Sequence, residues 1–302
     1  MNIKEYPNLL ILKNLIAPID NSLKKLDNCI SNISEDIDDV LIEGLFVLSI
    51  SSVEIMLSDI LKYFYRCFPL KLPKNGFQFD KDTFFNNQFD LIDKSIEGHI
   101  MSLSYKSYKE YFDIFLEQLS LEWKDYYTEF GDYIEEIKAT RNLLLHNNLV
   151  VNEQYIGSAG IKKRSNSISD KLTIKYDYAL SSLKLIIEFE KLLKAKIVKK
   201  YKIYTKVNAN KRFWGFIFKS PVMPYDDFWI YDEQKDEIIG YKEGKYEGAL
   251  SGSEVALLGL WRAHFAGSGS DHLKNFHMRR FDNKNREKVL FFLSTVHQFN
   301  LY

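Results

Sequence analysis

Cysteine, glycine and proline are all scarce in this chain. Its 302 residues include 2 cysteines, 14 glycines and 6 prolines. The two cysteines, Cys29 and Cys67, lack the spacing of metal ligands, so the sequence indicates neither a disulfide framework nor a structural zinc site. We therefore expect a reduced protein that needs no metal and no cofactor. Few glycines and prolines also favour a helix-rich fold.

The chain also lacks a long uninterrupted apolar run. The longest extends from Gly44 to Val53, between Glu43 and Glu54, and a membrane-spanning helix needs about 20 such residues. The N-terminus has no basic stretch followed by an apolar core, as a signal peptide would. These features predict a cytoplasmic protein without a membrane segment.

Hydrophobic residues make up 46% of the chain, which is enough for a proper core and argues against disorder. Apolar periodicity predicts helices near residues 8–32, 88–100, 104–119 and 176–200. A further long helix should begin at a cap on Ser34 and end at about Cys67, just before Pro69. Ser120 should cap another helix that carries Trp123 and continues toward residue 147.

The last hundred residues have a different pattern. Aromatic and β-branched runs at 213–218, 228–231 and 237–241 predict a small antiparallel sheet, and two helices should follow near 253–265 and 285–299. The fold class is therefore mainly α: a helical domain over residues 1–200, followed by a small α+β C-terminal domain over residues 201–302.

The stretch Arg141 to His146 is the most informative part of the sequence. It ends a predicted helix in which Ile134, Ile137, Leu144 and Leu145 form one apolar stripe, and Asn147-Asn148 supplies a stop. Arg141 falls on that stripe, so its guanidinium must point toward the packed side and be either paired or used. Asn142 and His146 are four residues apart and can hydrogen-bond on one face.

The Arg141-Asn142-x-x-x-His146 pattern at a helix end, followed by the polar residues 147–155, resembles the HEPN superfamily of helical domains. A second match lies in residues 46–57, where Glu54 stands among small and apolar residues, and the resemblance covers roughly residues 35–200. It implies a HEPN-like helical bundle, metal-independent RNA cleavage by Arg141 and His146 supported by Asn142, and pairing of two copies through the motif helices. It also implies a toxin or antiviral-defence role, with a possible antitoxin or trigger as a further partner.

The chemistry of these residue types agrees with that resemblance. Histidine can exchange a proton near neutral pH, since its ordinary pKa is about 6.5, and arginine can bind a charge-rich phosphate with its planar fork of donors. A purely structural alternative remains open. In that alternative Arg141 forms a buried ion pair, with Glu54 as the candidate partner, and His146 only complements the helix C-terminus. The chain would then be a non-catalytic nucleotide-binding or interaction scaffold.

The charge is uneven although the formal net charge is zero. Residues 1–161 carry 15 Lys/Arg against 25 Asp/Glu, residues 162–219 carry 16 against 4, and residues 220–302 carry 10 against 12, so the balances are −10, +12 and −2. The basic segment begins at Lys162, Lys163 and Arg164, directly after the motif. These three residues are candidate RNA-binding positions, and a solvated surface with a basic connecting loop is the alternative.

Overall fold

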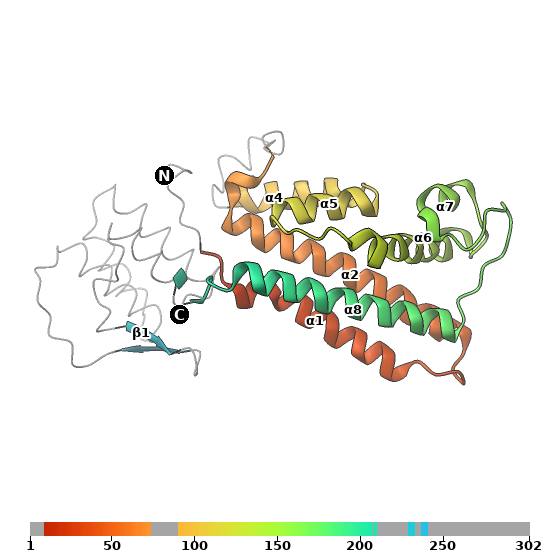
Figure 1. The fold of residues 1–302 in the computed structure, drawn as a ribbon, viewed down its shortest axis with the longest axis horizontal. Helices are drawn as coiled ribbons and strands as arrows, with labels where there is room; N and C mark the ends of the chain where they lie inside the picture. Colours follow the sequence, from red (N-terminus) through yellow and green to blue (C-terminus); the bar gives the residue numbers. More distant parts are fainter. Residues whose placement is uncertain (1–8, 74–89, 207, 210–228, 233–236, 241–302) are drawn as a thin grey trace, which may run out of the picture. The chain divides into compact units, whose positions relative to one another are not determined.

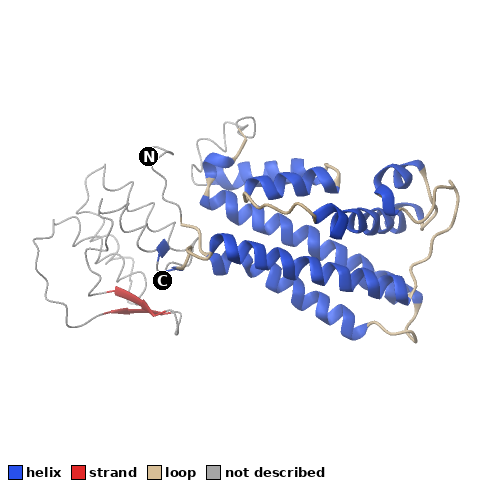
Figure 2. Ribbon diagram, viewed as in Figure 1, coloured by secondary structure: helices blue, strands red, loops and turns tan. Residues whose placement is uncertain are grey.

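The computed structural model describes residues 9–73, 90–206, 208–209, 229–232 and 237–240. The chain divides into two compact units, one of residues 13–202 and one that combines residues 1–12 with 203–302. The described part of the first unit is a helical bundle, as Figures 1 and 2 show. The mainly α class is therefore confirmed for these residues, and the domain boundary at residue 200 stays a prediction.

The longest helix, α2 (Asp39–Cys67), runs through the middle of the bundle. It contacts α4 (Asp90–Ser104), α6 (Asp132–Asn147) and α8 (Tyr176–Tyr201). Its buried face is apolar, with Phe46, Ile50, Val53 and Leu57 each at most 2% exposed. Burial of such side chains contributes about 1.5–3 kcal/mol each, so this face stabilises the whole unit.

Helix α1 (Leu12–Asn32) and helix α8 meet α2 through a small polar cluster in the core. Ser22 donates a 2.6 Å hydrogen bond to Oε1 of Glu190, and its hydroxyl lies 2.9 Å from that of Ser52. These three residues come from α1, α2 and α8, and Glu190 is fully buried. Burial raises the pKa of this carboxyl to about 8, and the hydrogen bond from Ser22 opposes that rise.

The first turn of α2 corrects one prediction. Ser34 does not cap the helix; Asp38 does, with an extended backbone and a side chain that accepts a hydrogen bond from the Val40 amide. Serine and aspartate are both good N-caps. Residues 35–37 therefore do not show whether the helix begins after Ser34 or after Asp38. The predicted end near Cys67 is confirmed, and Pro69 opens the short 3-10 helix Pro69–Lys71.

Helix α5 (Tyr108–Gln118) begins at a capping box between Ser107 and Glu110. After it, Ser120 was predicted to cap a helix through Trp123, and this is wrong. Ser120 has a φ of 50°, and residues 121–125 are irregular, because Trp123 packs edge-on against Phe112 and stacks on Phe189 of α8. Tertiary contacts with aromatic rings therefore replace the local helix.

Helix α6 is entered through the π-helical segment Tyr127–Gly131. A Cβ on Gly131 would lie 2.6 Å from the Tyr127 ring, so the π-helical segment leaves no room for a side chain at this position. The predicted stop is confirmed: α6 ends at Asn147, and Asn148 is left-handed with a φ of 47°.

The buried face of α6 differs from the predicted stripe. Ile134 and Ile137 are buried as expected, but Leu143 takes the next core position and Leu145 is 52% exposed. The reason is a polar core on this face. The carboxylate of Glu136 accepts hydrogen bonds from Thr140, Tyr155 and Tyr178, so polar side chains occupy part of this face.

Between α6 and α8 the chain forms α7 (Glu153–Ser158), the 3-10 turn Gly160–Lys162 and an extended return. Val151 donates to the carbonyl of Asp170 and Leu172 to that of Leu149, at 2.8 and 2.9 Å. The described part of the second unit holds one antiparallel strand pair, β1 (Trp229–Asp232) with β2 (Glu237–Gly240). The predicted strand at 213–218 and the helices at 253–265 and 285–299 lie outside the described residues.

Candidate functional site

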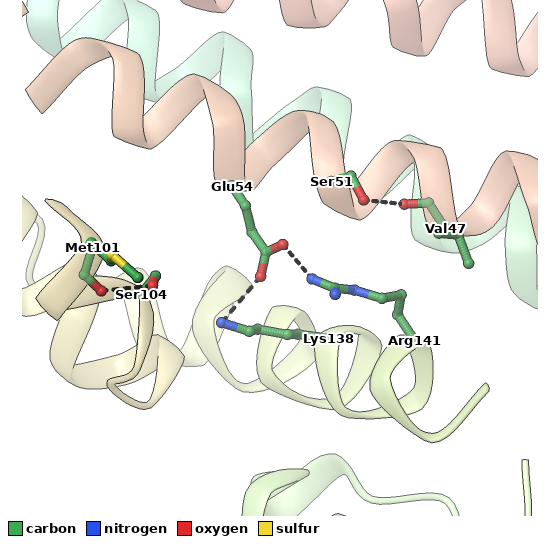
Figure 3. Close-up of polar contacts among 7 residues, drawn as sticks. All are labelled: Val47, Ser51, Glu54, Met101, Ser104, Lys138 and Arg141. Atoms are coloured by element: carbon green, nitrogen blue, oxygen red, sulfur yellow. Dashed lines mark hydrogen bonds and ion pairs between the residues drawn. The ribbon is translucent and has the colours of Figure 1, made fainter. Parts of the chain in front are cut away.

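Glu54 on α2 binds two cations from α6, as Figure 3 shows. The Nη2 atom of Arg141 donates to Oε2 of Glu54, and Nζ of Lys138 lies 3.2 Å from Oε1. The predicted partner of Arg141 is therefore the observed one. The two cations occupy both carboxylate oxygens, which holds the middle of α6 against the middle of α2.

Arg141 is mostly buried but not fully satisfied. Its side chain is 13% exposed, and its Nε is a buried donor without a hydrogen-bond partner among the described residues. A buried donor of this kind normally has a partner in the protein, in water or in a ligand. Glu54 therefore leaves this Nε donor unused, and the donor is enclosed by the described residues.

A cavity of about 340 Å³ opens beside this ion pair. Its walls come from α2, α4, α5, α6 and the α4–α5 turn: Glu54, Leu57, Ser58, Ile100, Leu103, Ser104, Lys106, Tyr108, Tyr111, Lys138, Arg141 and Asn142. Three cationic side chains face one carboxylate in this lining, so the cavity favours an anion. Its volume falls at the small end of the range for ligand pockets.

Two tyrosines add neutral groups to the cavity wall. Burial raises the pKa of Tyr111, and the negative charge of Glu54 raises it further. Burial also raises the pKa of Tyr108, and Nζ of Lys138 lies 5.8 Å from the centre of its ring. Both phenols therefore keep their protons at neutral pH, so they add no negative charge to the cavity.

The structure brings together Glu54, Arg141 and Asn142, but His146 stands apart from them within one chain. Asn142 lines the cavity, whereas His146 lies one helical turn further on and is exposed. The two side chains share a helix face as predicted, but no hydrogen bond joins them. His146 occupies the last turn of α6, where a cation complements the helix dipole.

The three basic candidates after the motif have different environments. Nζ of Lys162 lies 4.4 Å from the centre of the Tyr133 ring. Arg164 stacks over Tyr178 at 4.0 Å and donates a 2.6 Å hydrogen bond to the Thr173 carbonyl. Lys163 has no partner among the described residues. Arg164 therefore holds its own loop in place, and Lys163 is the least restrained cation of the three.

Sequence reasoning missed Lys138 and Lys106. Lys138 stands three residues before Arg141, so helical spacing already placed the two on one face. Lys106 lies in the turn between α4 and α5, and nothing local connects that turn with α6. Over the residues that the structure describes, no group of three His, Cys, Asp or Glu side chains could hold a metal ion.

Helix α2 is the one described helix whose length and composition would allow it to cross a membrane. The apolar core helix of a bundle passes the same test, and α2 packs against α4, α6 and α8. Comparisons with protein-family models, with curated proteins and with solved structures found no match to this chain.

Proposed function

We propose that this chain is a metal-independent endoribonuclease, built on a HEPN-type helical bundle with a small α+β domain at its C-terminus. It would act in the cytoplasm as a toxin or antiviral-defence effector that cuts cellular RNA. The observation that carries the proposal is Arg141, which lines a cationic cavity and stands five residues before the exposed His146 on the same helix.

The residues supply the parts that such cleavage needs. The 2′-oxygen of a ribose attacks the adjacent phosphorus, a bond to that oxygen forms, and the bond to the 5′-oxygen breaks. An imidazole such as that of His146 takes the 2′-hydroxyl proton, and an imidazolium returns a proton to the leaving 5′-oxygen. Arg141 and Lys138 stabilise the charge that gathers on the phosphorane. The products are a 2′,3′-cyclic phosphate and a 5′-hydroxyl.

A homodimer through the α6 ends would complete such a site. His146 does not line the cavity of its own chain, so a second copy could bring its imidazole to the cavity or receive this one. Asn142, between the two groups, would position the phosphate or the histidine. An antitoxin or trigger would act by covering or opening this cleft.

The test uses purified full-length protein, total RNA and EDTA, with mapping of the RNA termini. We expect wild type to cleave the RNA and the His146→Ala and Arg141→Ala variants not to cleave it. Both variants should have the circular dichroism spectrum of wild type, which shows that they fold. Leu192→Ala, at a 40% exposed position on α8, is the control that should still cleave. Undiminished cleavage by His146→Ala would remove the proposal.

One observation favours a second candidate, a non-catalytic nucleotide-binding or interaction scaffold. The guanidinium of Arg141 already has a carboxylate partner, and His146 lies outside the cavity. In that case wild type would leave RNA intact. A mononucleotide such as ATP would still bind, and its affinity would fall in Lys138→Ala and be unchanged in His146→Ala.

A further inference from the structure

The cavity beside Glu54 has an apolar part and a cationic part. The apolar part comes from α2, α4 and α5 and consists of side chains that are each at most 8% exposed: Leu57, Ile100, Leu103 and Tyr108. The cationic part comes from α6, with Lys138 and Arg141. Figure 3 shows both cations around Glu54, with Ser104 at the end of α4 nearby. A ligand that fills the cavity must therefore combine an apolar body with negative charge.

Lys106 adds a third cation from the turn between α4 and α5. It is exposed and forms no ion pair with a described carboxylate. Glu110 is bound to Ser107 instead: two hydrogen bonds from Ser107 lower the pKa of Glu110, and the charge of Lys106 lowers it further. Three cations against Glu54 leave a formal surplus of two positive charges in the lining. The two phosphates that flank one nucleotide in a strand carry the matching negative charge.

Three neutral polar groups of the lining have unused hydrogen-bonding capacity. The hydroxyls of Ser58 and Tyr111 and the side-chain amide of Asn142 have no hydrogen-bond partner among the described residues. Because the pKa of Tyr111 is raised by burial and then by the charge of Glu54, its phenol can donate and accept at neutral pH. Polar groups beside an apolar surface match the polar edge and flat face of an unpaired nucleobase.

An aromatic ring stands at the rim of the cavity. Tyr105 is 80% exposed, and its two chain neighbours, Ser104 and Lys106, both line the cavity. Proteins that bind single-stranded nucleic acid combine exposed aromatic rings, on which bases stack, with cations that bind the backbone. Tyr105 and Lys106 supply both groups where a strand would leave the cavity.

We propose that the cavity holds one nucleotide of single-stranded RNA, and that Tyr105 stacks on the next base outside it. The base lies against the apolar part, and the flanking phosphates bind Lys106, Lys138 and Arg141. The assignment rests on the proposed function for the choice of RNA, and it adds which part of the strand the chain recognises. A cavity of about 340 Å³ has room for one small ligand, so it admits an unpaired base and excludes a duplex.

A free mononucleotide offers the same chemistry without the next base, so the test compares the two sources. Full-length His146→Ala protein serves for all binding measurements, because RNA stays intact and His146 lies outside the cavity of its own chain. The probes are a labelled six-nucleotide single-stranded RNA, the same RNA in a duplex, the four 5′-mononucleotides and inorganic phosphate. The single strand should bind more tightly than the duplex and than any mononucleotide. Inorganic phosphate that competes as well as a mononucleotide would overturn the binding of a base.

Substitutions in the His146→Ala protein separate the parts of the proposed site. Tyr105→Ala should weaken binding of the single strand about 10-fold, since one stacked base is lost, and leave the mononucleotides unaffected. Tyr111→Phe keeps the ring and removes one hydrogen bond, so it should weaken both ligands roughly 3- to 10-fold. Lys106→Ala should lower the salt slope of RNA binding by about 0.7. Lys184→Ala, at an exposed position on α8, is the matched control and should leave the slope unchanged.

The outcomes distinguish this inference from the proposed cleavage. Unchanged RNA affinity in Tyr105→Ala would assign the cavity to a free mononucleotide and overturn the RNA assignment. Unchanged binding of both ligands in Tyr111→Phe and Lys106→Ala would overturn the pocket itself. Wild type that cleaves RNA, with a His146→Ala protein that binds neither ligand, would overturn the pocket alone. Wild type that leaves RNA intact, with a pocket that binds as described, would overturn the cleavage alone.

Discussion

Replacing Glu190 with glutamine should stabilise this protein, and by an amount that grows with pH. Glu190 is fully buried between α1, α2 and α8. Its Oε1 accepts the hydrogen bond from Ser22, while its Oε2 is buried without a partner among the described residues. A charged carboxylate in that position would lack the donors that a buried charge requires. The folded protein therefore holds this carboxyl in its neutral form.

The magnitude follows from the raised pKa. The pKa of Glu190 is about 8 in the folded chain, against an ordinary value of 4.5. Because the folded-state pKa is the higher one, the contribution of Glu190 is fully present below about pH 4.5 and is lost as the pH rises through about 8. One pKa unit corresponds to about 1.4 kcal/mol, so the loss is at most about 5 kcal/mol.

Glutamine keeps the shape and the acceptor for Ser22 but cannot ionise. The unfolding free energies of wild type and Glu190→Gln should be similar near pH 5. They should separate by a few kcal/mol near pH 8, with the variant the more stable. Denaturant titrations followed by far-UV circular dichroism measure both. Glu188→Gln, at an exposed position on the same helix, is the control and should show no such separation. A difference between Glu190→Gln and wild type that stays constant over this pH range would refute the reasoning.

Three further predictions concern the other polar contacts. Glu136→Gln should lower the unfolding free energy by about 2–4 kcal/mol, because three hydrogen bonds to a buried carboxylate are weakened. Limited proteolysis should then cut residues 159–172 faster than in wild type. Glu54→Ala should cost about 1–2 kcal/mol in a denaturant titration, since two partly buried cations lose their partner; an unchanged midpoint would contradict this. Lys163→Ala should reduce the salt slope of RNA binding by about one unit in filter binding without changing the melting temperature, whereas Arg164→Ala should lower that temperature.

Local signals in the sequence predicted much of the helical unit. Helix α8 was expected over 176–200 and spans Tyr176–Tyr201, and the end of α6 at Asn147 followed from two asparagines. These features depend on apolar periodicity and on capping, which act within a few residues. The same local signals gave wrong predictions at Ser34 and Ser120. Asp38 caps α2 in place of Ser34, and the packing of Trp123 on aromatic rings replaces the helix expected after Ser120.

The sequence by itself placed Arg141 on a packed helix face, where a guanidinium must be either paired or used, and it indicated Glu54 as a candidate partner. Only the tertiary structure decided that Lys138 and Lys106 join Arg141 around one cavity and that His146 lies outside it within one chain. It also decided that Glu190 is buried beside Ser22 and that Leu41, Leu48 and Ile55 are left uncovered. The reason is physical: periodicity fixes which residues share a helix face, but packing between distant helices fixes which face is enclosed and which remains open.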